Sequence, residues 1–148
     1  MKPTIFYQVL SILLLISLAV YGAPLLWAAP QNVVVGDGTP ASCDNNTLGA
    51  ALLADDTVTF NCGPNPHTIV ADTYVINGAI EIDGGNLITL DGENLRQIFL
   101  VQQGASLTLR NITLRRGFGS SGPGGAIWNF GTLLLQNSTI AESGTDTV

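Results

Sequence analysis

The feature that most constrains the fold is a repeat in the C-terminal part of the sequence. Residues 107–114 (LTLRNITL) recur as residues 133–140 (LLLQNSTI), at an offset of 26 residues. The leucines at alternate positions match between the two copies, and Asn111 matches Asn137. A fixed period of this length is typical of proteins built from stacked repeating units.

Within each copy, apolar residues alternate with polar ones, which is the spacing of a β-strand, and the alternation slips at Asn111 as it would at a corner. Copies that stack in register place Leu133 on Leu107 and Asn137 on Asn111, where the side-chain amides form a hydrogen-bonded ladder. We therefore predict an all-β fold, a right-handed parallel β-helix in which stacked coils share one core. The alternative is an antiparallel sandwich with a chance repeat, but such a sheet has no need for a matched asparagine.

The beginning of the chain is typical of a signal peptide. Lys2 precedes an apolar run over residues 5–20, and this pattern predicts a Sec signal peptide within residues 1–29, cleaved near Gly22 or near Ala29. The alternative is an uncleaved anchor, although the run is shorter than the ~20 apolar residues that a membrane span needs. We expect a chain that is secreted or displayed on the bacterial cell surface, with no stable membrane span after processing.

The remaining chain is acidic. Beyond residue 29, four arginines and no lysine oppose 11 acidic residues, which leaves a formal net charge of −7. Such a chain is a poor candidate for binding nucleic acid or anionic membranes.

Residues 30–63 are predicted to form an N-terminal cap. We expect an edge strand at residues 32–35, a short helix at residues 48–54 with Thr47 as its N-cap, and a strand at residues 57–60. The two cysteines of an exported chain, Cys43 and Cys62, are expected to form a disulfide that joins this cap to the first coil. Residues 64–148 are then the coils of the β-helix.

Two octads, residues 79–86 and 87–94, each read as an alternating strand that ends in Asp-Gly. Asp-Gly favours a hairpin, but we interpret the octads as consecutive sides of one coil. The glycine- and serine-rich residues 115–125 are expected to loop out of the coil. His67 is expected to be a solvated loop residue.

A polysaccharide lyase of this fold would need carboxylates that converge on a cation and a basic residue beside them. The candidates for these roles are Asp83, Asp91, Glu93, Arg110, Arg115 and Arg116. Asp83 and Asp91 precede glycines and fit corner positions, while Arg115 and Arg116 are expected to be solvated. We therefore expect no catalytic, metal or cofactor site.

Aromatic residues suggest a binding role instead. In an alternating strand Trp128 points away from Ile127 and hence outward, and Phe118 and Phe130 lie nearby in the sequence. An exposed aromatic patch of this kind can mark a contact with sugar rings or a host surface. The alternative is that residues 115–125 fold over Trp128 and cover it.

Several segments resemble those of bacterial surface proteins with a right-handed parallel β-helix. The segments that carry the resemblance are residues 34–40, Cys43, residues 47–54, 57–63, 82–85, 107–114, 124–129 and 137–140. Residues 124–140 are similar to the repeat of the polymorphic outer-membrane-protein type and of pectin-lyase-like proteins. Residues 43–54 resemble the CSLREA-type leader, with Gly49-Ala50 where that motif carries Arg-Glu.

The resemblance implies an adhesin-like protein of which this chain is an N-terminal piece, or else the product of a truncated gene, with the coils of residues 64–148 cut off at the C-terminus. We expect a non-enzymatic module that binds glycans or a host or cell-surface polymer. The alternatives are the capped start of a pectate-lyase-like enzyme and a structural stalk without a ligand. For a chain that stops at Val148, self-association through an open C-terminal coil is expected as well, since that coil would leave unpaired strand edges.

Overall fold

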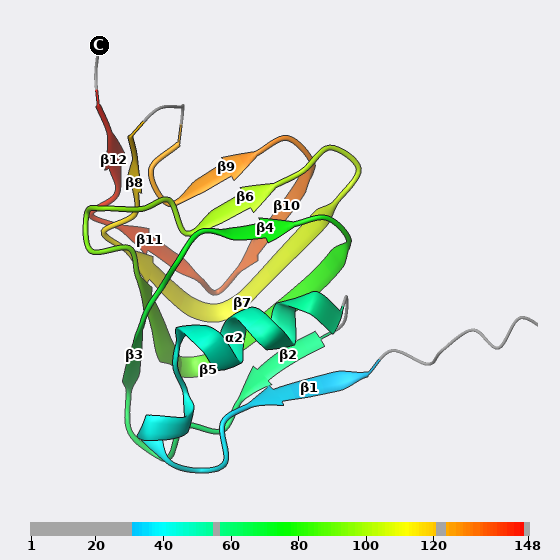
Figure 1. Ribbon diagram of the computed structural model, residues 1–148, viewed down its shortest axis with the longest axis vertical. Helices are drawn as coiled ribbons and strands as arrows, with labels where there is room; N and C mark the ends of the chain where they lie inside the picture. Colours follow the sequence, from blue (N-terminus) through cyan, green and yellow to red (C-terminus); the bar gives the residue numbers. More distant parts are fainter. Residues whose placement is uncertain (1–30, 55–56, 121–123, 147–148) are drawn as a thin grey trace, which may run out of the picture.

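The computed structural model describes residues 31–54, 57–120 and 124–146. The predicted signal peptide, residues 1–29, lies outside these ranges. The chain is mostly β-strand, with one short α-helix near its start (Figure 1). The elements in chain order are β1 (Asn32–Val35), η1 (Pro40–Ser42), α2 (Asn45–Ala51), η2 (Leu52–Ala54), β2 (Thr57–Phe60), β3 (His67–Val70), β4 (Tyr74–Ile76), β5 (Ala79–Asp91), β6 (Phe99–Val101), β7 (Ser106–Arg115), β8 (Phe118–Gly119), β9 (Ile127–Asn129), β10 (Thr132–Gln136), β11 (Thr139–Ala141) and β12 (Gly144–Thr145).

The strands form three sheets, and every strand pairing among the described residues is parallel. The seven-stranded sheet has the order β1-β2-β5-β7-β10, with β3 paired to β5 and β11 paired to β7. A three-stranded sheet has the order β4-β6-β9, and β8 pairs with β12. The paired strands β1 and β2 are separated by the helical segments, and all other strands that pair are separated in the sequence by at least one strand of another sheet, so the chain returns repeatedly to the same sheet (Figure 1).

Equivalent side chains lie above one another along these sheets. Leu133 pairs with Leu107 in parallel register, as the repeat predicts. One inner column runs through five strands, because Val33 pairs with Val58, Val58 with Ile82, Ile82 with Leu109 and Leu109 with Leu135. Its three central residues are fully buried, so the sheets share a core built from stacked aliphatic side chains.

The first octad and most of the second are consecutive parts of one strand. Strand β5 runs through residues 79–91, and its two halves pair in parallel with the two halves of β7. The register shifts between Asp83 and Ile88, where the chain turns a corner. The hairpin that Asp-Gly favours is therefore absent here, because the following residues continue the same parallel ladder.

The three-stranded sheet contributes larger side chains to the core. Tyr74 pairs with Phe99, and Phe99 pairs with Ile127. The ring centroids of Tyr74 and Phe99 lie 5.7 Å apart, and Phe99 is fully buried. The next residue along each of these strands points outward, and these residues form a second column of Val75, Leu100 and Trp128.

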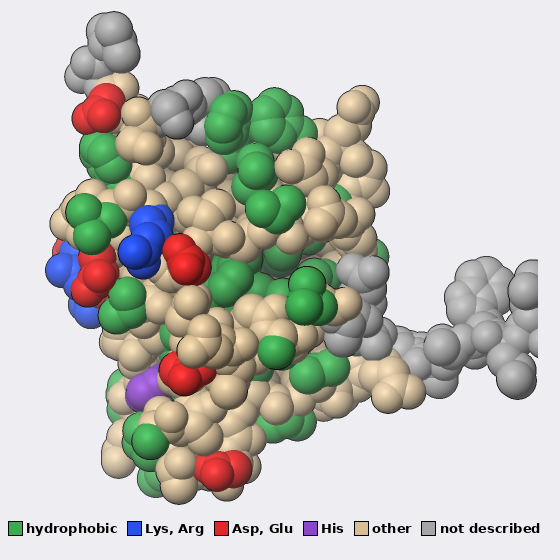
Figure 2. Space-filling model, in the orientation of Figure 1, with side chains coloured by type: hydrophobic (Ala, Val, Ile, Leu, Met, Phe, Trp, Pro, Cys, Tyr) green, Lys and Arg blue, Asp and Glu red, His purple; other side chains and the backbone are tan. Residues whose placement is uncertain are grey.

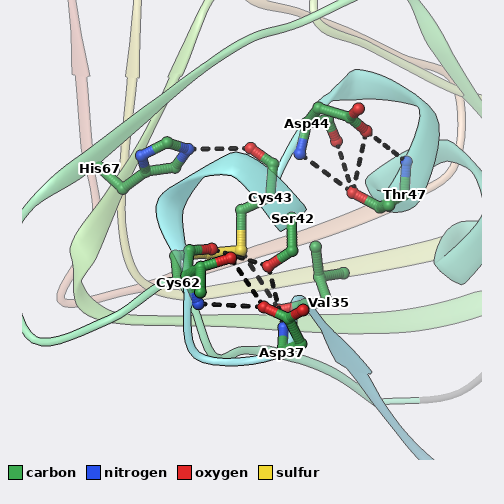
Figure 3. The surroundings of a disulfide bond; sticks show 9 residues. Val35, Asp37, Ser42, Cys43, Asp44, Thr47, Cys62 and His67 are labelled. Carbon is green, nitrogen blue, oxygen red and sulfur yellow. Dashed lines mark hydrogen bonds between the residues drawn. A yellow bond between two sulfur atoms is a disulfide. The ribbon is translucent and has the colours of Figure 1, made fainter.

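Helix α2 begins earlier than the sequence predicts. It spans Asn45–Ala51, and the N-cap is Asp44, not Thr47. The Asp44 side chain accepts a hydrogen bond from the Thr47 backbone N–H at 2.8 Å, and the Thr47 hydroxyl oxygen accepts one from the Asp44 N–H at 3.0 Å (Figure 3). This reciprocal capping box satisfies two backbone donors, whereas a lone N-cap side chain would satisfy only one, which explains the earlier start.

The helix covers the core at the N-terminal end of the sheets. Leu48 is 0% exposed and Ala51 is 6% exposed. Asn45 accepts hydrogen bonds from the Tyr74 hydroxyl at 2.7 Å and from the Asp72 backbone N–H at 3.0 Å. Burial raises the pKa of Tyr74 to about 12, so the phenol stays protonated and serves as the donor.

The predicted disulfide is confirmed. Cys43 and Cys62 are bonded, with their Cα atoms 5.6 Å apart, and join the loop before α2 to the end of β2 (Figure 3). A Cβ at Gly36 would lie 2.3 Å from Cys43 Sγ, so only glycine fits beside the bridge. His67 is half-buried and its Nε2 lies 2.8 Å from the Cys43 carbonyl oxygen, which corrects its assignment as a solvated loop residue.

Asparagines occupy the corners within β5 and β7 and the equivalent corner between β10 and β11. Asn86, Asn111 and Asn137 all have φ between 49° and 62°, a left-handed conformation that asparagine tolerates better than most residues. The Asn137 side-chain amide donates to Oδ1 of Asn111 at 2.8 Å and to Oδ1 of Asn86 at 3.1 Å. Asn111 in turn donates to Asp83 at 2.9 Å. This arrangement is the one that the predicted ladder of Asn111 and Asn137 requires.

We expect Asn111→Ala to lower the free energy of unfolding by about 2 kcal/mol, because alanine loses the ladder hydrogen bonds and resists the left-handed backbone. The Asn111→Gly variant tests the two contributions separately, since glycine accepts the backbone conformation but lacks the amide. Glycine should therefore cost less than alanine in urea unfolding. An alanine variant as stable as the glycine variant would contradict the backbone part of the argument.

Candidate ligand-binding face

An outward-facing apolar column lies on the three-stranded sheet. It consists of Val75, Leu100 and Trp128, which are in register on β4, β6 and β9. Val75 is 49% exposed, whereas Leu100 and Trp128 are half-buried. Hydrophobic side chains gather over β9 and β6 on the face that Figure 2 shows.

Phe130 extends this face beyond the end of β9. It is 54% exposed, and its ring centroid lies 5.0 Å from that of Trp128, with the rings tilted by 39°. This distance is within the range of favourable aromatic pairs. Trp128 and Phe130 thus form an outward-facing aromatic pair, which we call the aromatic pair below.

A pocket opens beside Trp128 and combines aromatic with polar groups. It is lined by Thr73, Leu95, Arg96, Gln97, Phe118, Gly119, Ser120 and Trp128. The side chain of Gln97 donates to the Gly124 carbonyl at 2.7 Å, and the Thr73 hydroxyl donates to the Gln97 carbonyl at 2.7 Å. These bonds join the residues that precede β4, β6 and β9, so the pocket wall is held by contacts between neighbouring turns of the chain.

Arg96 provides the positive charge of this pocket. Its Nε lies 3.3 Å from Asp72 Oδ1, and both side chains are well exposed, at 45% and 58%. An exposed ion pair of this kind is worth little, so the guanidinium can exchange Asp72 for a ligand at small cost. A few polar groups beside apolar and aromatic walls are typical of small-molecule sites.

Two of the three predicted aromatic residues share this pocket, and the third lies next to it. Phe118 and Trp128 line the same pocket, and Phe130 borders a second hollow with Gln102 and Gln103. The expected loop over residues 115–125 needs correction, because Phe118–Gly119 form β8 and pair with β12. The chain there keeps its place in the stack, which puts Phe118 at the pocket wall.

The carboxylates proposed for polysaccharide cleavage have structural partners. Asp83 accepts hydrogen bonds from the Asn111 side chain and from the Gly85 backbone N–H, each at 2.9 Å. Arg110 pairs with Glu81 at 2.9 Å, and Glu93 is exposed. These contacts hold Asp83 at a corner and Arg110 on a strand face, so that of the groups named in this paragraph only Glu93 has a side chain without a partner among the described contacts.

Asp91 has the strongest set of contacts. It is only 1% exposed, and it accepts hydrogen bonds from Arg115 Nε and Arg116 Nε, each at 2.8 Å, from Arg116 Nη2 and from the Glu93 backbone N–H at 2.9 Å. The hydrogen bonds from Arg116 hold the pKa of Asp91 below its ordinary value of 3.8, although burial acts in the opposite direction. The same contact raises the pKa of Arg116. The expectation that both arginines are solvated holds only in part: their side chains are 41% and 38% exposed, but each also closes one side of a buried carboxylate.

Within residues 31–54, 57–120 and 124–146, no three His, Cys, Asp or Glu side chains come together as a metal site would require. The same ranges contain no helix with the length and apolar character needed to cross a membrane.

Comparison with known proteins gives no relative. No family model matches this chain, and no curated protein and no solved structure is significantly similar to it. The function of the chain is therefore inferred from its sequence and its geometry alone.

Proposed function

We propose that the chain is an exported, non-enzymatic module with a right-handed parallel β-helix, which serves a cell-surface, adhesin-like protein and binds glycans through the aromatic pair and the adjoining pocket. The parallel pairing of every described strand and the five-residue inner column support the stacked architecture. The apolar run after Lys2 supports export.

The observation that carries the binding proposal is the position of Trp128 and Phe130. Trp128 lies on the outward side of β9, and Phe130 follows directly after that strand. The inward side chains of the sheet already fill the core, so the packing of the core does not require these two aromatic rings on the outer face. Aromatic rings present a large apolar area at a small loss of conformational entropy, and the apolar faces of sugar rings stack on such surfaces. Arg96 and Ser120 at the pocket wall supply partners for sugar hydroxyl or carboxylate groups.

The contacts of the acidic residues favour binding over cleavage. A lyase needs carboxylates that are free to hold a cation and a base that is free to accept a proton. In this chain Asp91 is enclosed by two arginines and Asp83 is bonded to the asparagine ladder. Formation of unsaturated sugars from pectate-like polymers in the presence of calcium would instead support the lyase alternative.

We expect Trp128→Ala to weaken glycan binding at least about tenfold, because an aromatic side chain at the centre of a contact face often dominates its affinity. The measurement is titration calorimetry with a polysaccharide first identified by screening the chain against a glycan array. Leu53→Ala is the matched control, since Leu53 is 85% exposed and outside the pocket.

Equal affinity of the Trp128→Ala variant and the parent would exclude the aromatic pair as the site. A parent chain that binds none of the arrayed glycans would favour the structural stalk. The cleavage of the signal peptide is checked separately, by sequencing the N-terminus of the exported chain.

A further inference from the structure

Two hollows lie at opposite ends of β6. The pocket beside Trp128 is bounded by Arg96, which comes before β6 in the chain. The second hollow is bounded by Gln102 and Gln103, which follow β6 directly, and we call it the glutamine hollow. Strand β6 spans Phe99–Val101, so the two hollows are separated by the length of a three-residue strand, about 10 Å.

The aromatic pair connects these two hollows. Trp128 lines the pocket, and Phe130 lines the glutamine hollow. Their ring centroids are 5.0 Å apart, which leaves little space between the two rings. The outer face therefore has a continuous apolar floor that runs in the direction of β6 and β9, with polar groups at both of its ends.

Phe130 is held against the end of β6 by backbone contacts. Its N–H donates to the Val101 carbonyl at 2.9 Å, and the next N–H, that of Gly131, donates to Oδ1 of Asn129 at 3.1 Å. A Cβ at Gly131 would lie 2.5 Å from the Gln102 carbonyl oxygen, so glycine allows the turn after β9 to pack on the turn after β6. The glutamine hollow is thus built from two turns in contact.

The amides of the glutamine hollow are open to a ligand. At the other end of β6, the Gln97 amide is already bonded to the Gly124 carbonyl. The side chains of Gln102 and Gln103, by contrast, form no hydrogen bond with another residue in the part of the chain that the structure describes, and Gln103 is exposed. A side-chain amide offers donors and an acceptor, which are the partners that sugar hydroxyl groups need.

We propose that this face binds a linear oligosaccharide that lies along β6 and β9, across the stack of coils; the inference rests on the proposed function. The distance between the hollows gives the ligand at least about three sugar units. One unit occupies the pocket at Arg96, the next stacks on the aromatic pair, and the third bonds to the glutamine hollow.

The polar groups set this direction. A ligand that followed the axis of the stack would leave Trp128 along the column of Leu100 and Val75. These aliphatic side chains offer no hydrogen-bond partner to a hydroxyl group. Along the strands, the same ligand finds polar partners at both ends of the apolar floor.

The test is titration calorimetry with cello-, xylo-, malto- and chito-oligosaccharides, each from the monosaccharide to the hexasaccharide. In a series that binds, the affinity should rise at least about tenfold from the monosaccharide to the trisaccharide, because each occupied subsite adds contacts. The Gln102→Ala/Gln103→Ala variant should bind the trisaccharide about fivefold more weakly, which corresponds to the loss of a hydrogen bond, and should bind the disaccharide like the parent.

Two further variants serve as controls. Gln136→Ala removes an amide that lies outside both hollows, and its affinity for the trisaccharide should equal that of the parent. Val75→Ala tests the direction, since a ligand along the stack axis would lose a contact there and a ligand along β6 would not.

This inference and the proposed function fail in different ways. A monosaccharide that binds as tightly as the trisaccharide, with binding still lost in Trp128→Ala, overturns the linear ligand and leaves the proposed function intact. Affinity that falls in Val75→Ala but not in the glutamine variant overturns the direction along the strands. Absence of binding in all four series overturns the inference as well, and the glycan array then decides the proposed function by itself.

Discussion

Removal of the Cys43–Cys62 disulfide should lower the free energy of unfolding by about 3 kcal/mol. The bond joins residues 19 apart, and a closed loop of that length restricts the unfolded chain by about this amount. Both cysteines are buried, at 3% and 4% exposure, and the Cys43 carbonyl also contacts His67. The bridge therefore holds the loop before α2 against the start of the sheets.

The Cys43→Ala/Cys62→Ala variant measures this contribution by urea unfolding without leaving a free thiol. Dithiothreitol should destabilise the parent by a similar amount and leave the double variant unchanged, which is the control for nonspecific effects of the reductant. A double variant within 1 kcal/mol of the parent would mean that the packing of α2 holds the cap by itself and that the bridge adds little.

The sequence predicted the parallel stacking well in the part of the chain where the spacing is constant. Leu107 pairs with Leu133, and Thr113 pairs with Thr139 at the same offset. The offset is the same because the corner that separates the two strand halves has the same length in both copies of the repeat. A single asparagine makes that corner, so the repeat keeps its register from β7 to β10 and β11.

The earlier strands were harder to align because their corners differ. The corner in β5 contains Gly84, Gly85 and extra residues where β7 has Asn111 alone, and the register shifts there. A Cβ at Gly84 would lie 2.8 Å from the Asn111 carbonyl oxygen, so glycine allows the longer corner to pack against the next strand. A single 26-residue frame cannot describe both kinds of corner.

The contact between Asp91 and Arg115 has a signal in the sequence that lies outside the 26-residue repeat. The triplet Ile-Thr-Leu occurs at residues 88–90 and again at residues 112–114, and it is followed by Asp91 in one case and by Arg115 in the other. Aligning the triplets places the opposite charges in register, as the strands do. Burial of the carboxylate was not predictable, since it depends on how Arg116 turns back at the corner.

The start of helix α2 and the pocket beside Trp128 also depend on contacts that a local sequence pattern does not predict. Thr47 is a good N-cap residue by type, but the reciprocal bonds with Asp44 decide the start of α2. Likewise, the outward direction of Trp128 follows from alternation along the strand, whereas its neighbours Arg96 and Phe118 come from other strands and turns. The alternation along a strand determines to which side a side chain points, whereas tertiary contacts determine which other residues it meets.

The second large effect is expected for Asp91→Asn, which should lower the free energy of unfolding by about 3 kcal/mol at pH 7. The amide keeps the shape of the side chain but removes the charge that both arginines contact, and breaking a buried ion pair by removing one partner is strongly destabilising. The cost stays at the lower end of the usual range because Arg115 and Arg116 are 41% and 38% exposed and can turn to water. Urea unfolding of the parent and the variant measures the difference.

The pH dependence gives this prediction an independent readout. The pKa of Asp91 is lower in the folded chain than its ordinary value of 3.8, so the unfolded chain takes up the proton first. The stabilisation is therefore fully present above about pH 4 and is lost as the pH falls through the folded pKa. The difference between the parent and Asp91→Asn should shrink below pH 4, whereas Asp72→Asn, which alters an exposed ion pair, should change stability by less than about 0.5 kcal/mol at any pH. A parent-to-variant difference that stays constant down to pH 2 would show that Asp91 contributes through its shape alone and not through the charge that the two arginines enclose.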